Sequence, residues 1–259
     1  MTTYSRHPAF LSLQGGINFR DLGGLHTADG RRVRRETPAL RLVTPDDRRG
    51  SEPPDNLPVT RVIDYRDPHE VQRSPDRLNG RMRYLNAPAN PLTPEVDAKV
   101  TELNAATLNA MNGEKFMLQL YRQLPFNNAA YRQLAGWLMQ PADGALLQHC
   151  AVGKDRTGVG CALTLFALGC DTPTVMEEYL LTHGTLNQVE SGLLGLLGDQ
   201  LTPRGRQNLA EILTVNESYL AAALSAIHER YTSVDGWLEQ EYQLTPDARE
   251  ALRSRFLEG

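Results

Sequence analysis

The segment from residue 144 to residue 169, GALLQHCAVGKDRTGVGCALTLFALG, constrains the fold more than any other part of the chain. It opens with a short apolar run after Gly144, which is typical of a strand in the middle of a parallel sheet. The residues that follow Arg156 are small and apolar, which predicts a helix packed within the core. A strand, a tight polar loop and a buried helix in this order predict an α/β domain.

Short β-like runs come before this unit. The first part of the chain contains a predicted hairpin in LHTADGRRVRR, residues 25–35, and predicted strands at Ala39–Val43 and Thr60–Asp67. From Thr93 to Gln140, leucine, methionine and aromatic residues recur at three- and four-residue spacing, which predicts amphipathic helices. The C-terminal part has the same texture, and Asp171 or Thr172 can cap a helix there. The expected fold class is therefore α/β, with a central, mainly parallel sheet flanked by helices and a helical lid or insertion.

The chain has the size of one domain that carries inserted helices. With 259 residues, of which 41 % are hydrophobic, it can fill a core of its own. We expect one domain over residues 1–259, with candidate helical lid segments around 93–140 and 184–215. Within the second, SGLLGLLGDQLTPRG at 191–205 has glycines at three-residue spacing, which favours a mobile loop or lid.

Charge and composition exclude several classes of partner. A formal net charge of -4 argues against nucleic acid, and the run RRVRR at 31–35 fits a solvated strand better than a phosphate-steering patch. Because no apolar run reaches about 18 residues, we expect no integral membrane segment. Three cysteines do not make a disulfide framework and fit a reducing compartment. We expect a cytoplasmic protein, and export without a cleaved signal stays open.

The polar loop HCAVGKDR can bind a phosphate group. Successive backbone N–H groups from Ala151 to Arg156 can curl into an anion cradle at the N-terminus of the following helix, with Gly153 allowing the bend. The planar guanidinium of Arg156 can bind two phosphate oxygens at once. The same donors stabilise a thiolate at Cys150, which makes it a nucleophile facing the phosphorus atom. The predicted phosphate-binding residues are Ala151, Val152, Gly153 and Lys154. Arg156 and the amides supply the charge, so no metal or other cofactor is expected.

A nucleotide site, a zinc site and an inert turn fit the loop less well. A Walker A loop would need a glycine at Gln148 and a serine or threonine at Asp155. A zinc site would need a second cysteine or histidine pair, whereas Cys161 and Cys170 lie in or after the apolar helix, where we expect core thiols. A buried, inert Cys150 would leave the charged residues of the same turn unexplained.

The sequence HCAVGKDRTG resembles the signature of an atypical bacterial family of tyrosine and phosphoinositide phosphatases within the protein tyrosine phosphatase superfamily. GINFRDLGGLHTADGRRVR at 16–34, VIDYRDPHE at 62–70 and EEYLLTH at 177–183 resemble other blocks of that family, so the likeness spans nearly the whole chain. It implies a single tyrosine phosphatase-like domain. It also implies that Cys150 forms a phosphocysteine, that Arg156 clamps the phosphate and that Thr157 hydrogen-bonds the departing sulfur. His149 would lie behind the loop, orienting it and favouring the thiolate.

The general acid has two candidates. Neither tryptophan is followed by Pro-Asp, so the upstream acid loop of conventional tyrosine phosphatases is missing. Asp155 is the first candidate, as is proposed for the resembling family. Asp64 is the second, because it lies near the carboxyl end of a predicted strand, where sites of open α/β sheets lie. The alternative for Asp64 is a structural ion pair with Arg66.

Two further features of the sequence bear on substrate and support. Lys154 adds a charge beyond what one phosphate monoester needs, and similar loops of phosphoinositide phosphatases use such a lysine for a neighbouring ring phosphate. Arg20 and Asp21 are expected to bond to each other as a bracket near the loop, and contact between Arg20 and substrate is the alternative.

The expected function is therefore a cysteine-dependent phosphatase. Its substrates would be phosphotyrosyl proteins, phosphoinositides or both, hydrolysed through a phosphocysteine intermediate. Two alternatives stay open: a phosphate-binding module without turnover, and a thiol enzyme that handles sulfur or arsenate. The last would need a second, resolving thiol close to Cys150.

Overall fold

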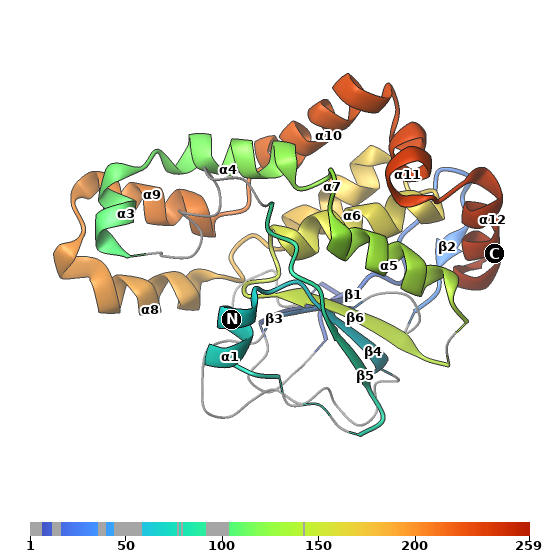
Figure 1. The fold of residues 1–259 in the computed structure, drawn as a ribbon, viewed down its shortest axis with the longest axis horizontal. Coiled ribbons are helices and arrows are strands. Elements are labelled where there is room, and N and C mark those ends of the chain that lie inside the picture. Colours follow the sequence, from blue (N-terminus) through green and yellow to red (C-terminus); the bar gives the residue numbers. More distant parts are fainter. Residues whose placement is uncertain are drawn as a thin grey trace.

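The computed structural model describes residues 7–11, 17–35, 40–43, 59–76, 78, 80–91, 104–141 and 143–259. They form a sheet with a thick layer of helices on one side, and a helical arm that extends beyond the end of the sheet (Figure 1). The predicted α/β class with a mainly parallel sheet is confirmed.

Five strands make up the main sheet, in the order β1-β3-β6-β4-β5. They are β1 (Ile17–Asp21), β3 (Leu40–Val43), β4 (Val59–Asp64), β5 (Arg83–Asn86) and β6 (Ala145–Cys150). All pairs are parallel except β1 with β3. The apolar run before Cys150 is the middle strand, and the register places Asp64 beside His149 at the carboxyl end of the sheet.

The helices begin where the sequence offers a cap. Asparagine, aspartate, serine or threonine side chains accept backbone N–H groups at the starts of α3, α4, α5, α7 and α9 to α12. The helices are α1 (Pro68–Arg73), α3 (Ala105–Ala110), α4 (Gly113–Gln123), α5 (Ala129–Met139), α6 (Arg156–Leu168), α7 (Thr172–Leu180), α8 (Asn187–Leu197), α9 (Pro203–Leu213), α10 (Glu217–Tyr231), α11 (Val234–Tyr242) and α12 (Pro246–Phe256). Of the two predicted caps Asp171 is confirmed, since its side chain accepts Thr174 N–H, whereas Thr172 is the first residue of α7.

Helix α6 packs directly on the sheet, and every one of its residues is buried. A Cβ atom at Gly160 would lie 2.7 Å from the side-chain oxygen of Gln148 and 2.9 Å from the hydroxyl of Tyr65. The glycine therefore lets the helix approach strand β6 closely. The main core lies between the sheet, α5, α6 and the C-terminal helices, and a smaller cluster around Phe19 and Val62 covers the other face.

Two predictions about local structure need correction. Residues 187–197, which include the first part of the expected mobile loop at 191–205, form helix α8, because Leu193, Leu194 and Leu197 pack as a helical face against the core cluster. In the predicted hairpin the turn at Gly30 is present, with φ of 88°, but the returning strand β2 (Arg32–Val33) pairs mainly with β7 (Leu257–Glu258). The pattern of the sequence could not show this pairing with the far end of the chain.

The candidate lid segments divide between two parts of the molecule. Helices α3, α4, α8 and α9 form the arm, in which α4 lies along α9 and α10 (Figure 1). Helix α5 instead packs against α6, α11 and α12, so the end of the 93–140 segment belongs to the core. Residues 92–103 lie outside the described part. No helix among the described residues is both long enough and apolar enough to cross a membrane.

Candidate active site

The residues between Cys150 and Arg156 form a loop at the carboxyl end of the central strand. Cys150 ends β6 and Arg156 begins α6, so the positive end of the α6 dipole faces the loop. Gly153 has φ of 62°, a left-handed conformation that favours glycine. The side chain of Asn18, from β1, donates to the Gly153 carbonyl at 3.1 Å. This is the strand, bend and helix arrangement that an anion cradle requires.

Arg156 is fixed by a carboxylate that sequence reasoning did not single out. Its two terminal nitrogens donate to the two oxygens of Glu70 at 2.6 and 3.0 Å. Burial lowers the pKa of Arg156, but the charges of Cys150 and Glu70 outweigh it, and the pKa is raised. Glu70 itself is partly buried, which raises its pKa, but the bonds from Arg156 outweigh this and lower it. Glu70 thus holds the guanidinium as a preset fork beside the loop.

Helix α1 places this carboxylate. It starts with Pro68 after Asp67, and the backbone N–H of Asp67 donates to Glu70 at 2.8 Å, as in a capping box. The signal in the sequence was the run DPHE, which resembles a helix start, but nothing in it pointed to Arg156.

His149 lies behind the loop in a buried cluster of charges. Its Nε2 is 3.0 Å from a carboxylate oxygen of Asp76 and 3.8 Å from one of Asp64. Burial lowers the pKa of His149, but Asp64 and Asp76 outweigh it and raise the pKa. The two carboxylates therefore favour the charged form of the imidazole, which lies in the residue next to Cys150. Asp76 is a second supporting residue that the sequence did not reveal.

Asp64 takes part in the ion pair that the sequence offered as the alternative to an acid role. Arg66 donates to both of its oxygens, at 2.9 and 2.7 Å, and the hydroxyl of Tyr84 donates at 2.7 Å. Burial raises the pKa of Asp64, but His149 and Arg66 outweigh it and lower the pKa. A carboxylate held ionised in this way is a poor proton donor. The geometry therefore disfavours Asp64 as the general acid.

Asp64, Asp76 and His149 could in principle provide metal ligands, since their ligand atoms lie within 4.8 Å of one another. Arg66 already donates to both carboxylates, at 2.7 Å to Asp64 and 2.9 Å to Asp76. Its positive charge occupies the place where a cation would be attracted. The cluster therefore fits an ion-pair network better than a metal site.

Asp155, the first candidate for general acid, is bonded from two sides. The hydroxyl of Tyr121, on α4, donates to its Oδ1 at 2.8 Å, and Lys154 Nζ lies 2.6 Å from the same oxygen. The hydroxyl of Tyr179 lies 2.7 Å from that of Tyr121. Tyr121 is another residue that the sequence gave no reason to choose, because only the fold brings α4 to the loop.

The position of Lys154 does not fit the expectation that this lysine binds a neighbouring ring phosphate. Its side chain is fully buried, and Nζ lies over the ring of Tyr219 at 5.6 Å as well as beside Asp155. The lysine therefore acts inside the protein in this structure. Thr157, at the start of α6, is also buried, and its hydroxyl has no hydrogen-bond partner among the described residues. That leaves the hydroxyl able to donate to sulfur, as its expected role requires.

Arg20 does form a bracket near the loop, with Glu178 as the partner that the structure shows. Its Nε and Nη2 donate to one oxygen of Glu178 at 3.0 and 2.7 Å, and both side chains are buried. Asp21 instead accepts the backbone N–H of Gly23 at 2.8 Å. Neighbouring residues of a strand point to opposite faces, which separates these two side chains. The bracket thus joins β1 to helix α7.

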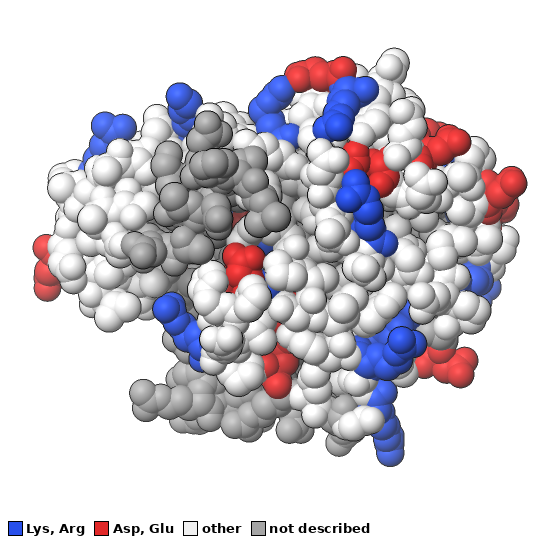
Figure 2. All heavy atoms as spheres, in the orientation of Figure 1, with Lys and Arg blue, Asp and Glu red and all other residues white. Residues whose placement is uncertain are grey.

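The other two cysteines are buried in the core, as expected. Cys161 lies within α6, and Cys170 follows it. Burial raises the pKa of Cys170 to about 12. On the face shown in Figure 2, basic and acidic side chains of the described residues are interspersed rather than gathered into one basic patch.

Comparison with known proteins identifies the family of the chain. The sequence model of the tyrosine phosphatase family matches residues 11–258. A protein of Cupriavidus necator that carries the name tyrosine-protein phosphatase is 31% identical over 269 residues, covering 97% of this chain and 93% of its own. The triple specificity protein phosphatase PtpB of Mycobacterium tuberculosis is 30% identical over 260 residues, covering 89% and 93%.

Among solved structures, TpbA of P. aeruginosa in complex with phosphotyrosine covers 74% of this chain and 89% of its own, at 16% identity and a TM-score of 0.28. So distant a likeness carries no weight for the site. The family match extends over nearly the whole chain, and both relatives are at least 30% identical over most of it. The chain therefore belongs to the tyrosine phosphatase family and is a hydrolase of phosphoric monoesters.

Proposed function

We propose that the chain removes phosphate from phosphotyrosyl proteins through a phosphocysteine intermediate on Cys150. The observation that carries the proposal is the loop itself: a cysteine at a helix N-terminus, with Arg156 held beside it by two bonds from Glu70. The names of the two relatives, a tyrosine-protein phosphatase and a triple specificity protein phosphatase, support a protein substrate.

In the first step the Cys150 thiolate attacks phosphorus, and the bond from phosphorus to the tyrosyl oxygen breaks. The loop amides and Arg156 stabilise the charge on the equatorial oxygens. Asp155 gives its proton to the departing phenolate oxygen. In the second step a water molecule loses a proton to Asp155 and attacks phosphorus, which releases inorganic phosphate and regenerates the thiolate. Thr157 donates to the departing sulfur in this step.

A phosphoinositide substrate has less support. The residue that favoured it in the sequence was Lys154, which is buried between Asp155 and the Tyr219 ring. To bind a ring phosphate, the lysine would have to leave both partners. A silent binding module has no support from the site, because Cys150 and Arg156 are both present. Cys161 is fixed within α6, one turn or more from its start, which gives a sulfur-handling role no accessible second thiol.

The test is phosphate release from phosphotyrosine peptides, phosphoserine peptides and inositol phospholipids, run beside Cys150→Ser. We expect turnover of phosphotyrosine peptides that disappears in the serine variant. Rapid quenching of Asp155→Asn during turnover, followed by intact-mass analysis, should reveal phosphate on Cys150. Turnover of lipids alone would contradict the proposed substrate, and turnover that survives Cys150→Ser would contradict the mechanism.

A further inference from the structure

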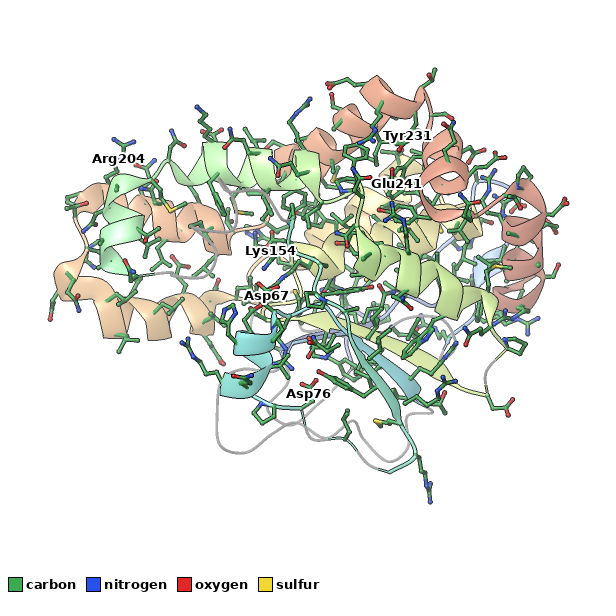
Figure 3. The ribbon with its side chains drawn as sticks, viewed as in Figure 1. Asp67, Asp76, Lys154, Arg204, Tyr231 and Glu241 are labelled. Carbon is green, nitrogen blue, oxygen red and sulfur yellow. The ribbon has the colours of Figure 1, made fainter. Side chains whose placement is uncertain are left out.

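A groove with a volume of about 910 Å³ opens beside the active-site loop. One wall is formed by the start of α1 and the loop after β5, and the other by the end of α4, the start of α5 and Arg230 of α10. Asp67, on the first wall, begins the helix that carries Glu70, and it lies close enough to Arg156 for its charge to act there. Its backbone N–H donates to Glu70, which in turn accepts from Arg156, so this wall adjoins the loop; Asp67 and Lys154 are labelled in Figure 3. The groove is therefore continuous with the neighbourhood of the catalytic loop.

The wall away from the loop carries positive charge. The Arg230 side chain is exposed and lies over the ring of Phe126 at 4.9 Å, and no described carboxylate forms an ion pair with it. Arg122 pairs with Glu229 at 2.5 Å, but both side chains are about half exposed, at 45% and 56%. Exposed pairs of this kind are weak in water and can exchange partners. An acidic group in the groove would meet both guanidinium groups.

The rest of the lining suits an extended peptide. Pro68, Pro88 and Pro91 line one side, and Phe126 lies opposite them. Asn90 and Asn128 add amide groups, although Asn90 donates to Asp67 at 2.5 Å and Asn128 to the Ala89 carbonyl at 3.0 Å. Prolines and an aromatic ring offer flat apolar surface to side chains that flank a bound residue.

The distribution of charge favours a peptide over a lipid headgroup. A polyphosphorylated ring would need cations on the side of the groove nearest the loop, where the described structure places Asp67. Arg122 and Arg230 line the groove together with Phe126, on α4, α10 and the residues after α4. His69, also on the first wall, is the only other ionisable lining residue among those described.

We propose that this groove binds the residues that flank phosphotyrosine in a protein substrate, and that Arg122 and Arg230 select an acidic side chain among them. The inference rests on the proposed function and gives it a sequence preference. Exposed ion pairs of one substrate carboxylate with these two arginines correspond to a preference for an acidic over a neutral flanking residue of about threefold to tenfold in kcat/KM. The effect should lie mainly in KM, because the arginines do not touch the reacting atoms.

The experiment measures kcat/KM for phosphotyrosine peptides that differ at one flanking position at a time, carrying Glu, Gln or Lys. For the wild type we expect kcat/KM to be highest with Glu, lower with Gln and lowest with Lys at one or more flanking positions. This preference should become smaller as the salt concentration rises from about 0.05 M to about 0.5 M. Arg122→Ala with Arg230→Ala should bring the Glu-to-Gln ratio to about one. The loss on the Glu peptide should exceed any loss on para-nitrophenyl phosphate, which has no flanking residues.

Arg204→Ala is the matched control, because Arg204 is an exposed arginine on α9, at the end of the arm away from the groove (Figure 3). It should keep the wild-type preference. The groove proposal would be overturned if the wild type had the same kcat/KM for all flanking residues, or if Arg204→Ala changed the preference as much as the double variant does. Either result would leave the phosphatase proposal intact. Failure to hydrolyse any phosphotyrosine peptide, with turnover of inositol phospholipids, would overturn both.

Discussion

Helices α6 and α8 have opposite surroundings in the same molecule. Every residue of α6 is buried, whereas α8 has no buried residue and exposes 72% of Leu196. Helix α6 begins at the catalytic loop and packs on the sheet, while α8 lies in the arm (Figure 1). Cys150 and Arg156 are thus positioned by the most buried part of the fold. Asp155 directly precedes Arg156, yet the hydroxyl that donates to it belongs to Tyr121, on α4 in the arm.

This comparison separates the side of the site that carries the proposed nucleophile, called the nucleophile side, from the side that carries the proposed general acid, called the acid side. The nucleophile side depends on carboxylates that are buried or partly buried: Glu70 fixes Arg156, Asp76 fixes His149, and Glu178 fixes Arg20. The acid side depends on two tyrosine hydroxyls and a lysine shared between arm and body. Changes on the first side should cost both stability and rate, and changes on the second should cost rate alone.

The largest expected effect is on stability, from Glu178→Gln. The change removes the charge that Glu178 presents to the buried Arg20 guanidinium, and breaking a buried pair costs about 3–5 kcal/mol. For a chain of this size the melting temperature should fall by about 10 °C. Calorimetry checks this. Glu229→Gln, at an exposed pair, should shift stability by less than about 1 kcal/mol. Equal melting temperatures for the two variants would show that the bracket does not stabilise the body.

The local structure around Cys150 could be predicted from the sequence, whereas contacts between side chains far apart in the sequence could not. The strand, loop and helix around Cys150 follow from a short apolar run, a glycine bend and small apolar residues, and they form as expected. Arg156 and Glu70 are 86 residues apart, and Arg20 and Glu178 are 158 apart. No local pattern records such contacts, since they depend on how the strands are ordered in the sheet.

The prediction of a loop in the region of helix α8 was wrong for a different reason. Its glycines at positions 192 and 195 lower helix propensity, which favoured a loop, but Leu197 follows Leu193 and Leu194 by four and three residues, which is helical spacing. Contact of those leucines with the core outweighs the propensity of two residues. The same limit applies to Tyr121: its helix was predictable, but its contact with Asp155 follows from the packing of the arm.

The second effect concerns rate, through Glu70→Gln. Loss of one charge lets the Arg156 fork leave its preset position, and a misplacement of about 1 Å can cost about 100-fold in rate. We expect kcat/KM for a phosphotyrosine peptide to fall by about that factor, with weaker inhibition by vanadate. Glu70→Asp, which keeps the charge on a shorter stem, should recover part of the loss. A Glu70→Gln enzyme with wild-type kinetics would show that Arg156 needs no partner.

The third effect is a pH dependence of stability, through His149. Because Asp64 and Asp76 raise its pKa above the unfolded value of about 6.5, its ion pairs stabilise the fold fully below that pH. The contribution is lost as pH rises from about 6.5 through the raised folded pKa. Asp76→Asn should therefore cost about 2 kcal/mol near pH 6 and less at higher pH. Urea unfolding of both proteins across this range measures the difference, and a difference independent of pH would argue that His149 stays neutral.

The smallest effect tests the acid side, through Tyr121→Phe. The change removes one neutral hydrogen bond to Asp155, worth about 1 kcal/mol, so kcat/KM should fall about fivefold. If Tyr121 positions the general acid, the loss must grow with the basicity of the leaving group. It should be large for phosphotyrosine peptides and small for para-nitrophenyl phosphate, whose leaving group needs little protonation.

Tyr219→Phe is the matched control for that variant. Its ring lies 5.8 Å from the ring of Tyr121 and beside Lys154, but its hydroxyl donates to Glu211 at 2.8 Å. It removes the same group from the same neighbourhood without touching Asp155, so its loss should not depend on the leaving group. If both variants lose rate equally on every substrate, the arm only supports the loop, and the division of the site between body and arm fails. If only Tyr121→Phe shows the dependence, the acid is positioned by the arm, and movement of α4 would change proton transfer while leaving the nucleophile in place.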